Sequence, residues 1–451
     1  MNNFKQLGLS ANLLEILDQI GFTKPTPIQE QAIPLLLENN PTDFIGLAQT
    51  GTGKTAAFGL PLIDLVDSGN KATQALIMAP TRELGQQTGK QLIEFSSKHK
   101  ALNIEVVYGG AAISNQIRAL RTPTQIVVAT PGRLLDLIRR RAIKLDDVKH
   151  VVLDEADEML NMGFKEDIDD ILSNIKVPHS TWLFSATMPA DIRKIVKKYM
   201  TEPKEVAINT EQKSNEDITH QYIVTKVGDK LAAVRRFLDI QPDLRGIMFC
   251  RTRRETQQIS DDLSQMGYGV EALHGELSQA QRDSAMKRFK ARSMQLLVAT
   301  DVAARGIDVN DLTHVIHHTL PDQLESYTHR SGRTGRAGNK GISLAFINPR
   351  ESRKINDLER RLKISFEKID VPSADLIKNI RLEKWADQMN TAKIDSNVDE
   401  YLEMLLPKLE KLSREDILKV LVSKELETLI NQDFSGGNLN QKAGEKGNSN
   451  S

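Results

Sequence analysis

The feature that most constrains the fold is a glycine-rich loop between an apolar run and a helical pattern. Residues 44–47 are apolar, and an apolar helical pattern begins at Ala56. Gly51 and Gly53 allow a tight turn whose backbone N–H groups point inward, and the helix that follows adds partial positive charge. The loop therefore predicts a phosphate-binding site on an α/β sheet. The alternative is a glycine-rich turn with an exposed lysine.

The end of this loop carries the two side chains expected to contact the nucleotide phosphates. Lys54 would reach the β- and γ-phosphates, and the Thr55 hydroxyl would bind Mg²⁺. The first glycine of the G-x-x-x-x-G-K-[ST] pattern is missing, because Ala48 stands there. The loop residues predicted to bind nucleotide are Ala48, Gln49, Thr50, Gly51, Thr52, Gly53, Lys54 and Thr55.

A short apolar run at residues 151–153 ends in Asp154, Glu155 and Asp157. Ligands bind where buried parallel strands end, so Asp154 would emerge beside the phosphates and hold Mg²⁺. Glu155 would orient and deprotonate the attacking water. A solvated acidic helix start is the alternative, and the presence of Lys54 in the phosphate loop argues against it.

The composition limits the function classes that remain. The 451 residues suggest about three domains, and 27% charged with 39% hydrophobic residues is typical of a soluble globular protein. The formal net charge is zero, so nucleic-acid binding would need local basic clusters. One cysteine, Cys250, rules out a disulfide framework, predicts no cysteine-based zinc site and fits a small core residue. No signal-peptide core or apolar span of membrane length is found, so we expect no membrane partner and a cytoplasmic protein.

A loop with Pro25 and Pro27 near the start of the chain leads to Gln29. Its amide would offer a donor and an acceptor to the edge of adenine, with Phe4 packed nearby. The alternative is a helix-capping turn with Gln29 in solvent.

The order of apolar runs and helical patterns predicts two doubly wound parallel sheets in tandem. We expect a first domain at 1–208, a linker at 209–217 and a second domain at 218–371. Strands of the first domain end in polar motifs that contain Thr81, Arg82, Thr130 and Arg133, which suit phosphates but could also be helix caps.

The second half has no phosphate loop of its own but carries arginines at a spacing of three. Arg330 and Arg333 would be neighbours on one helical face. Gly335 could end that helix, so that Arg336 projects from it. The alternative is a solvated basic face.

With these motifs in this order, the chain resembles a DEAD-box RNA helicase from about residue 4 to 347. The resemblance rests on Gln29, the loop at 48–55, the Asp154 to Asp157 tetrad, Ser185 to Thr187, and the segment from His329 to Arg336. The family's phosphate loop also begins with alanine, which accounts for Ala48. Gly85 and Ser331 depart from the residues that are usual in the family.

The resemblance implies two RecA-like domains that close around ATP and one RNA strand. It places Gln29 and Phe4 at adenine, Lys54, Thr55, Asp154 and Glu155 at the phosphates and Mg²⁺, Asp308 at the ribose, and Arg333 and Arg336 as arginine fingers. The RNA backbone would lie along Thr81, Arg82, Gly110, Thr130, Arg133 and Thr300. The residues that would link the two domains are Asp157, Ser185, Thr187 and His329.

Residues 372–432 predict a helical extension with an apolar stripe at Val398, Leu402, Leu405, Leu406 and Leu409, followed by a capping box at Ser413 and Asp416. This segment is similar to the dimerisation region of bacterial cold-shock DEAD-box helicases of the DeaD/CshA type. We expect either a homodimer through residues 398–430 or a helical cap on the second domain. Residues 433–451 are expected to be a disordered tail.

Three functions follow from the motifs. The favoured one is an ATP-dependent RNA helicase that opens short duplexes. The others are an ATP-gated RNA clamp and a DNA-directed helicase of the same superfamily. The physiological RNA is not encoded in these residues, because contacts to the backbone carry no base code.

Overall fold

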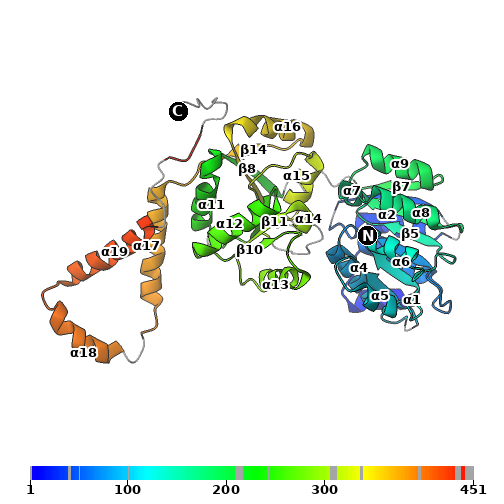
Figure 1. Cartoon of the computed structure of the whole chain (residues 1–451), viewed down its shortest axis with the longest axis horizontal. Coiled ribbons are helices and arrows are strands. Elements are labelled where there is room, and N and C mark those ends of the chain that lie inside the picture. The colour runs from blue at the N-terminus through cyan, green and yellow to red at the C-terminus, as the bar shows by residue number, and fades with distance from the viewer. Residues whose placement is uncertain are drawn as a thin grey trace. The chain divides into compact units, whose positions relative to one another are not determined.

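The computed structural model describes residues 3–38, 42–49, 51–99, 101–208, 217–241, 243–304, 312–335, 339–394, 398–431 and 438–441. The chain divides into two compact units with a boundary between residues 216 and 217. Each unit contains one parallel sheet flanked by helices, and three further helices follow the second sheet (Figure 1). The predicted fold class, two doubly wound parallel sheets with a helical extension, is confirmed.

The sheet of the first unit has the strand order β3-β4-β2-β5-β6-β1-β7, and all of its neighbouring strands are parallel. Its strands are β1 (Phe44–Leu47), β2 (Ala75–Met78), β3 (Ile104–Val107), β4 (Ile126–Ala129), β5 (His150–Leu153), β6 (Ser180–Ser185) and β7 (Lys204–Ala207). The helices are η1 (Phe4–Gln6), α1 (Ala11–Gln19), α2 (Pro27–Leu36), α3 (Lys54–Leu65), α4 (Arg82–Phe95), α5 (Ile113–Ala119), α6 (Pro131–Arg139), α7 (Ala156–Asn161), α8 (Lys165–Asn174) and α9 (Ala190–Tyr199).

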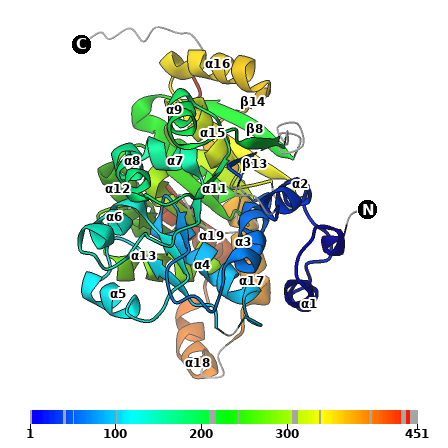
Figure 2. The same ribbon diagram turned by 90° about the vertical axis from the view of Figure 1, so that its right-hand side faces the viewer.

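Strand residues of the first unit alternate between two hydrophobic cores, one on each face of the sheet. Phe44 and Val152 pack with α1 to α4, whereas Ile45 and Val151 pack with α6 to α9. Figure 2 shows α2 and α3 side by side on the first of these faces. Because both faces are covered, the strands are almost continuously apolar, and their polar residues are concentrated where the strands end.

The second unit repeats this plan with the strand order β10-β11-β9-β12-β13-β8-β14, again with parallel neighbours. Its strands are β8 (Ile218–Val224), β9 (Gly246–Cys250), β10 (Val270–Leu273), β11 (Leu296–Thr300), β12 (His314–His317), β13 (Gly341–Ile347) and β14 (Phe366–Lys368). The helices are η2 (Val227–Asp229), α11 (Lys230–Ile240), α12 (Arg253–Gln265), α13 (Gln279–Lys290), α14 (Asp301–Ala304), α15 (Leu324–Ser331), η3 (Pro349–Glu351) and α16 (Ser352–Leu362).

The helical extension consists of α17 (Ala374–Thr391), α18 (Val398–Leu409) and α19 (Arg414–Asn431). Helix α17 packs on α11, where the Arg381 guanidinium donates to the Asp239 carboxylate at 2.6 Å. The capping box before α19 is confirmed, because the Ser413 hydroxyl accepts from the Asp416 N–H at 3.1 Å and the Asp416 carboxylate accepts from the Ser413 N–H.

Two details of the second unit differ from the predictions. The prediction of a disordered tail does not hold for residues 438–441, since Leu439 is buried in the core and the Gln441 N–H donates to the Val224 carbonyl at 2.9 Å. Helix α15 ends at Ser331, so Arg333 follows the helix and does not share a helical face with Arg330. In the described part of the chain, no helix is long and apolar enough to cross a membrane.

Candidate ATP and RNA site

The predicted phosphate loop follows β1 at the carboxyl edge of the first sheet and opens α3. Gly51 and Gly53 both have positive φ values, of 81° and 91°. A β-carbon on Gly53 would lie 2.3 Å from the Gln29 side-chain nitrogen, so any other residue here would strain the backbone and displace the Gln29 amide. The turn that the sequence predicts is therefore required by both the backbone conformation and the contact with Gln29.

Gln29 connects the start of α2 to the phosphate loop. Its Oε1 accepts from the Thr26 N–H at 2.9 Å, and its Nε2 donates to the Gly53 carbonyl at 3.0 Å. The side chain is buried, so the solvated capping turn considered as an alternative is wrong, although the capping interaction itself is present. Each amide atom retains capacity for one further hydrogen bond.

Two buried charged groups beside the loop each have an atom without a hydrogen-bond partner. Lys54 Nζ and Asp154 Oδ1 each have no hydrogen-bond partner among the described residues. Burial raises the pKa of Asp154, opposed by the Lys54 ammonium and reinforced by the neighbouring Glu155. A buried polar atom without a hydrogen bond costs free energy, so Lys54 Nζ and Asp154 Oδ1 are suited to hold ligands that the chain itself does not supply.

Glu155, between β5 and α7, has the left-handed backbone conformation with φ 49°. A non-glycine residue rarely adopts this conformation, and such strain is concentrated at functional sites. Because Glu155 directly follows Asp154, the strained turn presents two consecutive carboxylates at the carboxyl end of β5. This arrangement fits the prediction that Asp154 is a metal ligand and Glu155 a general base.

A hydrogen-bond network links the remaining predicted residues of the first unit. Asp157 accepts from the Thr187 hydroxyl at 2.8 Å, and the Ser185 hydroxyl donates to the Thr187 carbonyl at 2.7 Å. The Ala48 N–H donates to the Ser185 carbonyl at 3.0 Å, which connects this network to the phosphate loop. The loop that follows β6 is thus tied to both β1 and α7.

The predicted RNA residues of the first unit gather around Tyr108, which the sequence analysis did not identify. The Arg82 guanidinium lies 4.3 Å from the centre of the Tyr108 ring. Arg133 donates to the Gln116 side chain at 2.7 Å, and Gln116 donates to the Tyr108 carbonyl at 3.1 Å. The position of Tyr108, directly before two glycines in a predicted polar loop, was the available signal.

The hydroxyl groups of this region make different hydrogen bonds. Thr81 caps α4 by accepting from the Leu84 N–H at 3.2 Å, as the helix-cap alternative predicts. Thr130 accepts from the Gly109 N–H at 3.3 Å, and Gly110 has φ 86° with open space beside it. The loops after β2, β3 and β4 therefore form one continuous surface of hydroxyl, amide and guanidinium groups.

Phe4 is buried in the core of the first unit. Only 2% of its surface is exposed, and its ring centre lies 6.4 Å from that of Phe22. Its contact with adenine stays a prediction.

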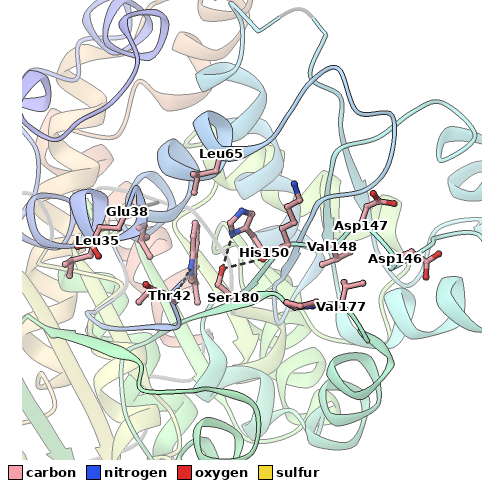
Figure 3. Close-up of a pocket in the computed structure, with 14 residues that line it drawn as sticks. Leu35, Glu38, Thr42, Leu65, Asp146, Asp147, Val148, His150, Val177 and Ser180 are labelled. Carbon is pink, nitrogen blue, oxygen red and sulfur yellow. Dashed lines mark hydrogen bonds between the residues drawn. The ribbon is translucent and has the colours of Figure 1, made fainter. Parts of the chain in front are cut away.

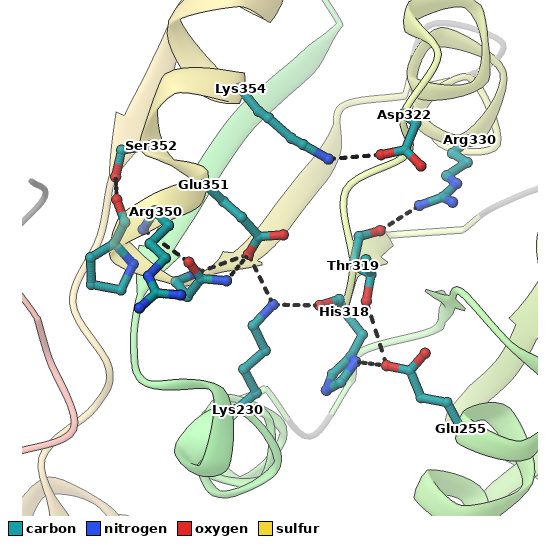
Figure 4. Close-up of polar contacts among 12 residues, drawn as sticks. Lys230, Glu255, His318, Thr319, Asp322, Arg330, Arg350, Glu351, Ser352 and Lys354 are labelled. Atoms are coloured by element: carbon teal, nitrogen blue, oxygen red, sulfur yellow. Dashed lines mark hydrogen bonds and ion pairs between the residues drawn. The ribbon is translucent and has the colours of Figure 1, made fainter. Parts of the chain in front are cut away.

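In the second unit, two backbone segments hold the Arg330 guanidinium. Its Nη2 donates to Asp301 at 2.7 Å and its Nη1 to the Thr319 carbonyl at 2.7 Å, as Figure 4 shows for Thr319. Both partners belong to segments at the carboxyl ends of β11 and β12. Thr300 ends β11 beside them, while His329 and Arg333 lie within and just after α15. Thr50, Asp308 and Arg336 lie outside the described residues.

A cavity of about 530 Å³ in the first unit lies away from these residues. It is lined by His150 and Ser180, which begin β5 and β6, and by Leu65 and Trp182 (Figure 3). These strand starts are at the amino edge of the sheet, opposite the phosphate loop. The cavity is therefore distinct from the candidate ATP site.

Comparison with known proteins identifies the family. Residues 26–195 match the DEAD/DEAH box helicase model, residues 229–338 match the helicase conserved C-terminal domain, and residues 377–433 match the helical domain of a probable ATP-dependent RNA helicase. The DEAD-box ATP-dependent RNA helicase CshA of Bacillus cereus (strain ATCC 10987 / NRS 248) is 47% identical over 375 residues, which cover 83% of this chain and 71% of the relative. This chain belongs to the DEAD-box ATP-dependent RNA helicases.

Further members of the family support the assignment. CshA of Bacillus subtilis (strain 168) is 43% identical, over 88% of this chain and 80% of that protein. The structure of S. cerevisiae Dbp5 bound to RNA and ADP BeF3 has a TM-score of 0.76 at 30% identity, over 84% of this chain and 99% of that one. The two sheets are accordingly tandem RecA-like domains, and the enzyme is an RNA helicase that hydrolyses ATP. In a DEAD-box helicase, the buried and unpartnered Lys54 and Asp154 fit ATP with a divalent metal ion.

Proposed function

We propose that the protein uses ATP to bind single-stranded RNA through its backbone and to open short RNA duplexes locally. The observation that carries this proposal is the pair of unpartnered atoms, Lys54 Nζ and Asp154 Oδ1, buried beside the phosphate loop. Phosphate oxygens and a metal ion would supply the missing partners, so binding of ATP would relieve the cost of burying these charges.

Within the ATP site, each residue has a separate role. Lys54 holds the phosphates, Thr55 and Asp154 hold Mg²⁺, and Glu155 orients and deprotonates the attacking water. When bound, Mg²⁺ neutralises charge on the phosphate oxygens. The remaining hydrogen-bond capacity of Gln29 is directed to adenine. Lys54, Asp154 and Gln29 would complete their hydrogen bonds only when the nucleotide is bound.

RNA binding is assigned to the surface around Tyr108, together with Thr300 of the second unit. Hydroxyl, amide and guanidinium groups recognise phosphate and ribose but not base edges. The Tyr108 ring and the Gln116 amide hold Arg82 and Arg133 in place, so these cations lose less conformational entropy when they bind phosphates.

Coupling between ATP and RNA is assigned to closure of the two domains. Arg333 and Arg336 would contact the γ-phosphate, Asp308 the ribose, and Asp157, Ser185, Thr187 and His329 would link the domains. Since neither domain alone carries both the phosphate loop and the arginines, hydrolysis would require closure, and RNA that bridges both domains would promote it.

The test combines three measurements on the full chain with one labelled RNA. We expect RNA to stimulate ATP hydrolysis more than a matched DNA does, ATP to drive separation of short duplexes, and affinity for single-stranded RNA to fall steeply with salt for several sequences alike. Long-lived ATP-dependent RNA binding without duplex separation would instead identify an ATP-gated clamp. Equal stimulation by DNA and RNA would contradict the assignment to RNA.

The helical extension is proposed to pair two copies of the chain. Helix α17 packs on its own domain and contacts α19, but many apolar side chains of α18 and α19 remain exposed. Those with more than a third of their surface exposed include Leu402, Leu405, Leu406, Leu409, Ile417, Leu418, Val420 and Leu421. Many exposed apolar side chains in neighbouring helices commonly mark an interface. Light scattering on the full chain and on a truncation ending near residue 371 tests the proposal, and two monomers would contradict it.

A further inference from the structure

A cysteine, a carboxylate and an imidazole come together at the carboxyl edge of the second sheet. Among the described residues, the ligand atoms of Cys250, Glu255 and His318 all lie within 4.8 Å of one another. Cys250 ends β9, Glu255 lies in the first turn of α12, and His318 follows β12. Open parallel sheets bind ligands at this edge.

The backbone holds the two strand ends together. The His318 N–H donates to the Phe249 carbonyl at 3.1 Å. Because Cys250 follows Phe249, this bond places the imidazole beside Cys250. His318 Nδ1 lies 2.7 Å from Glu255 Oε1 (Figure 4). The three side chains are thus brought together by the fold, although His318 is distant from Cys250 in the sequence.

We propose that Cys250, Glu255 and His318 form a zinc-binding site. A thiolate, an imidazole and a carboxylate are the ligand types that Zn²⁺ accepts, and three protein ligands with one open position is a common zinc arrangement. In a tetrahedral site the ligand atoms lie about 3.3–3.8 Å apart. Rotamer shifts on the order of 1 Å would therefore lengthen the distance between Glu255 and His318 and shorten the longer distances between ligand atoms.

Surrounding groups already orient two of the ligands. Glu255 Oε2 accepts from the Arg251 N–H at 2.9 Å, which leaves Oε1 as the ligand atom. The Lys230 ammonium donates to the His318 carbonyl at 2.9 Å (Figure 4). Such outer contacts reduce the entropy that the ligands lose when a metal binds.

The Cys250 thiol must lose its proton to bind a metal ion. Burial and then the Glu255 carboxylate raise the pKa of the Cys250 thiol well above its usual range, so the thiol is protonated without metal. One thiolate and one carboxylate together neutralise Zn²⁺, and the bound state would bury no net charge. Zinc binding must therefore release the thiol proton, and affinity should rise with pH.

The sequence predicted no cysteine-based zinc site, because a chain with one cysteine cannot provide the common sets of two to four cysteine ligands. That argument does not cover a mixed site whose other ligands are brought in by the fold. The proposed site also lies beside residues that we assign to the helicase activity. Cys250 is paired in register with Thr300. Thr319, which follows His318, accepts a hydrogen bond from Arg330. Metal at this site would fix the segments that hold both residues.

The experiment measures zinc and cobalt binding to the untagged full chain. We expect one zinc per chain by competition with a chromogenic chelator, and a thiolate-to-cobalt charge-transfer absorption with Co²⁺, which only Cys250 can produce because it is the only cysteine. Each of Cys250→Ala, Glu255→Gln and His318→Asn should weaken zinc binding by about 100-fold or more. Circular dichroism checks that each variant is folded.

Two matched controls replace a histidine and a carboxylate elsewhere, His179→Asn and Glu276→Gln, and both should leave the affinity unchanged. Absence of the cobalt charge-transfer band in the unmodified chain would overturn the proposal, and that measurement stands even if Cys250→Ala does not fold. Zinc affinity equal in His318→Asn and the unmodified chain would overturn it as well. The readout is metal binding, so it does not depend on helicase activity.

Discussion

Asp157 Oδ2 accepts two hydrogen bonds from Thr187, one from its backbone N–H at 3.0 Å and one from its hydroxyl at 2.8 Å. The other carboxylate oxygen of Asp157 accepts from the Glu158 N–H at 3.1 Å. A single buried carboxylate thus joins the first turn of α7 to the loop after β6. That loop is the part of the first domain that we assign to coupling with the second.

Asp157→Asn should weaken this junction more than its small change in size suggests. An amide offers one acceptor oxygen, so at least one of the three donors would face an N–H₂ group. We expect the loop after β6 to lose about 1–3 kcal/mol of local stability. Hydrogen exchange of peptides spanning Thr187 measures this loss, and Thr187→Ser, which keeps the hydroxyl, is the control. Unchanged protection in Asp157→Asn would show that the junction does not depend on the charge.

Lys54→Ala and Glu155→Gln should separate binding from hydrolysis. Removing the ammonium takes away the cation that holds phosphates, so nucleotide affinity should fall about 10- to 100-fold. Glu155→Gln keeps the volume of the side chain but removes the base, so turnover should fall about 10²- to 10⁴-fold at nearly unchanged affinity. Nucleotide titration and single-turnover hydrolysis measure the two effects. Equal loss of affinity in both variants would contradict the assigned roles.

How much of the fold the sequence revealed depends on where each strand lies. Strand β5 lies in the middle of its sheet with Val151, Val152 and Leu153 buried, so the apolar run at residues 151–153 identified it. Strands β3, β7, β8 and β14 lie at or next to a sheet edge, carry residues such as Glu105 and His220, and were not identified. An edge strand buries less surface, so its composition approaches that of a loop.

The residues of the candidate ATP site were easier to predict from the sequence than the residues that hold the site in place. Asp154 directly follows β5, and Lys54 begins the helix after β1, so short local patterns in the sequence fix the positions of both residues. The support of Arg82 by Tyr108 depends on two different loops meeting, and local patterns do not encode that distance. Gln29 shows a further limit, because the same side chain caps α2 and contacts the Gly53 carbonyl, and the second contact was not predicted from the sequence.

Gly53→Ala tests the close approach between the phosphate loop and Gln29. The substitution should cost about 1 kcal/mol for the left-handed backbone and a further 1–3 kcal/mol for the contact with the Gln29 amide. Gly21→Ala is the matched control in the same domain, since Gly21 also has positive φ, of 78°, but open space beside it. Urea unfolding of both variants gives the difference. Equal destabilisation would mean that the loop can move away from Gln29.

Arg333→Ala tests the proposed completion of the site by the second domain. Arginine fingers contribute about 10³–10⁵ in rate, so RNA-stimulated hydrolysis should nearly disappear while nucleotide affinity in the absence of RNA is retained. Arg353→Ala is the control, because Arg353 is an exposed arginine of α16 in the same domain. Undiminished RNA stimulation in Arg333→Ala would show that other residues complete the site.

Buried histidines should make the second domain sensitive to acid. Burial lowers the pKa of His220 and of His314 to about 4, below the value of about 6.5 in an unfolded chain. A depressed pKa contributes stability that is fully present above pH 6.5 and is lost as the pH falls toward 4, because the unfolded chain takes up the proton first. Each histidine should therefore remove about 2 kcal/mol from the free energy of unfolding between about pH 7 and pH 5. His314→Phe keeps a ring against Phe237, whose ring centre lies 5.6 Å away, but removes the titrating group. The measurement is urea unfolding at both pH values, monitored by hydrogen exchange of second-domain peptides. The free energy of unfolding should change less with pH in His314→Phe, by about 2 kcal/mol. The same change in both proteins would mean that His314 is not held neutral by burial.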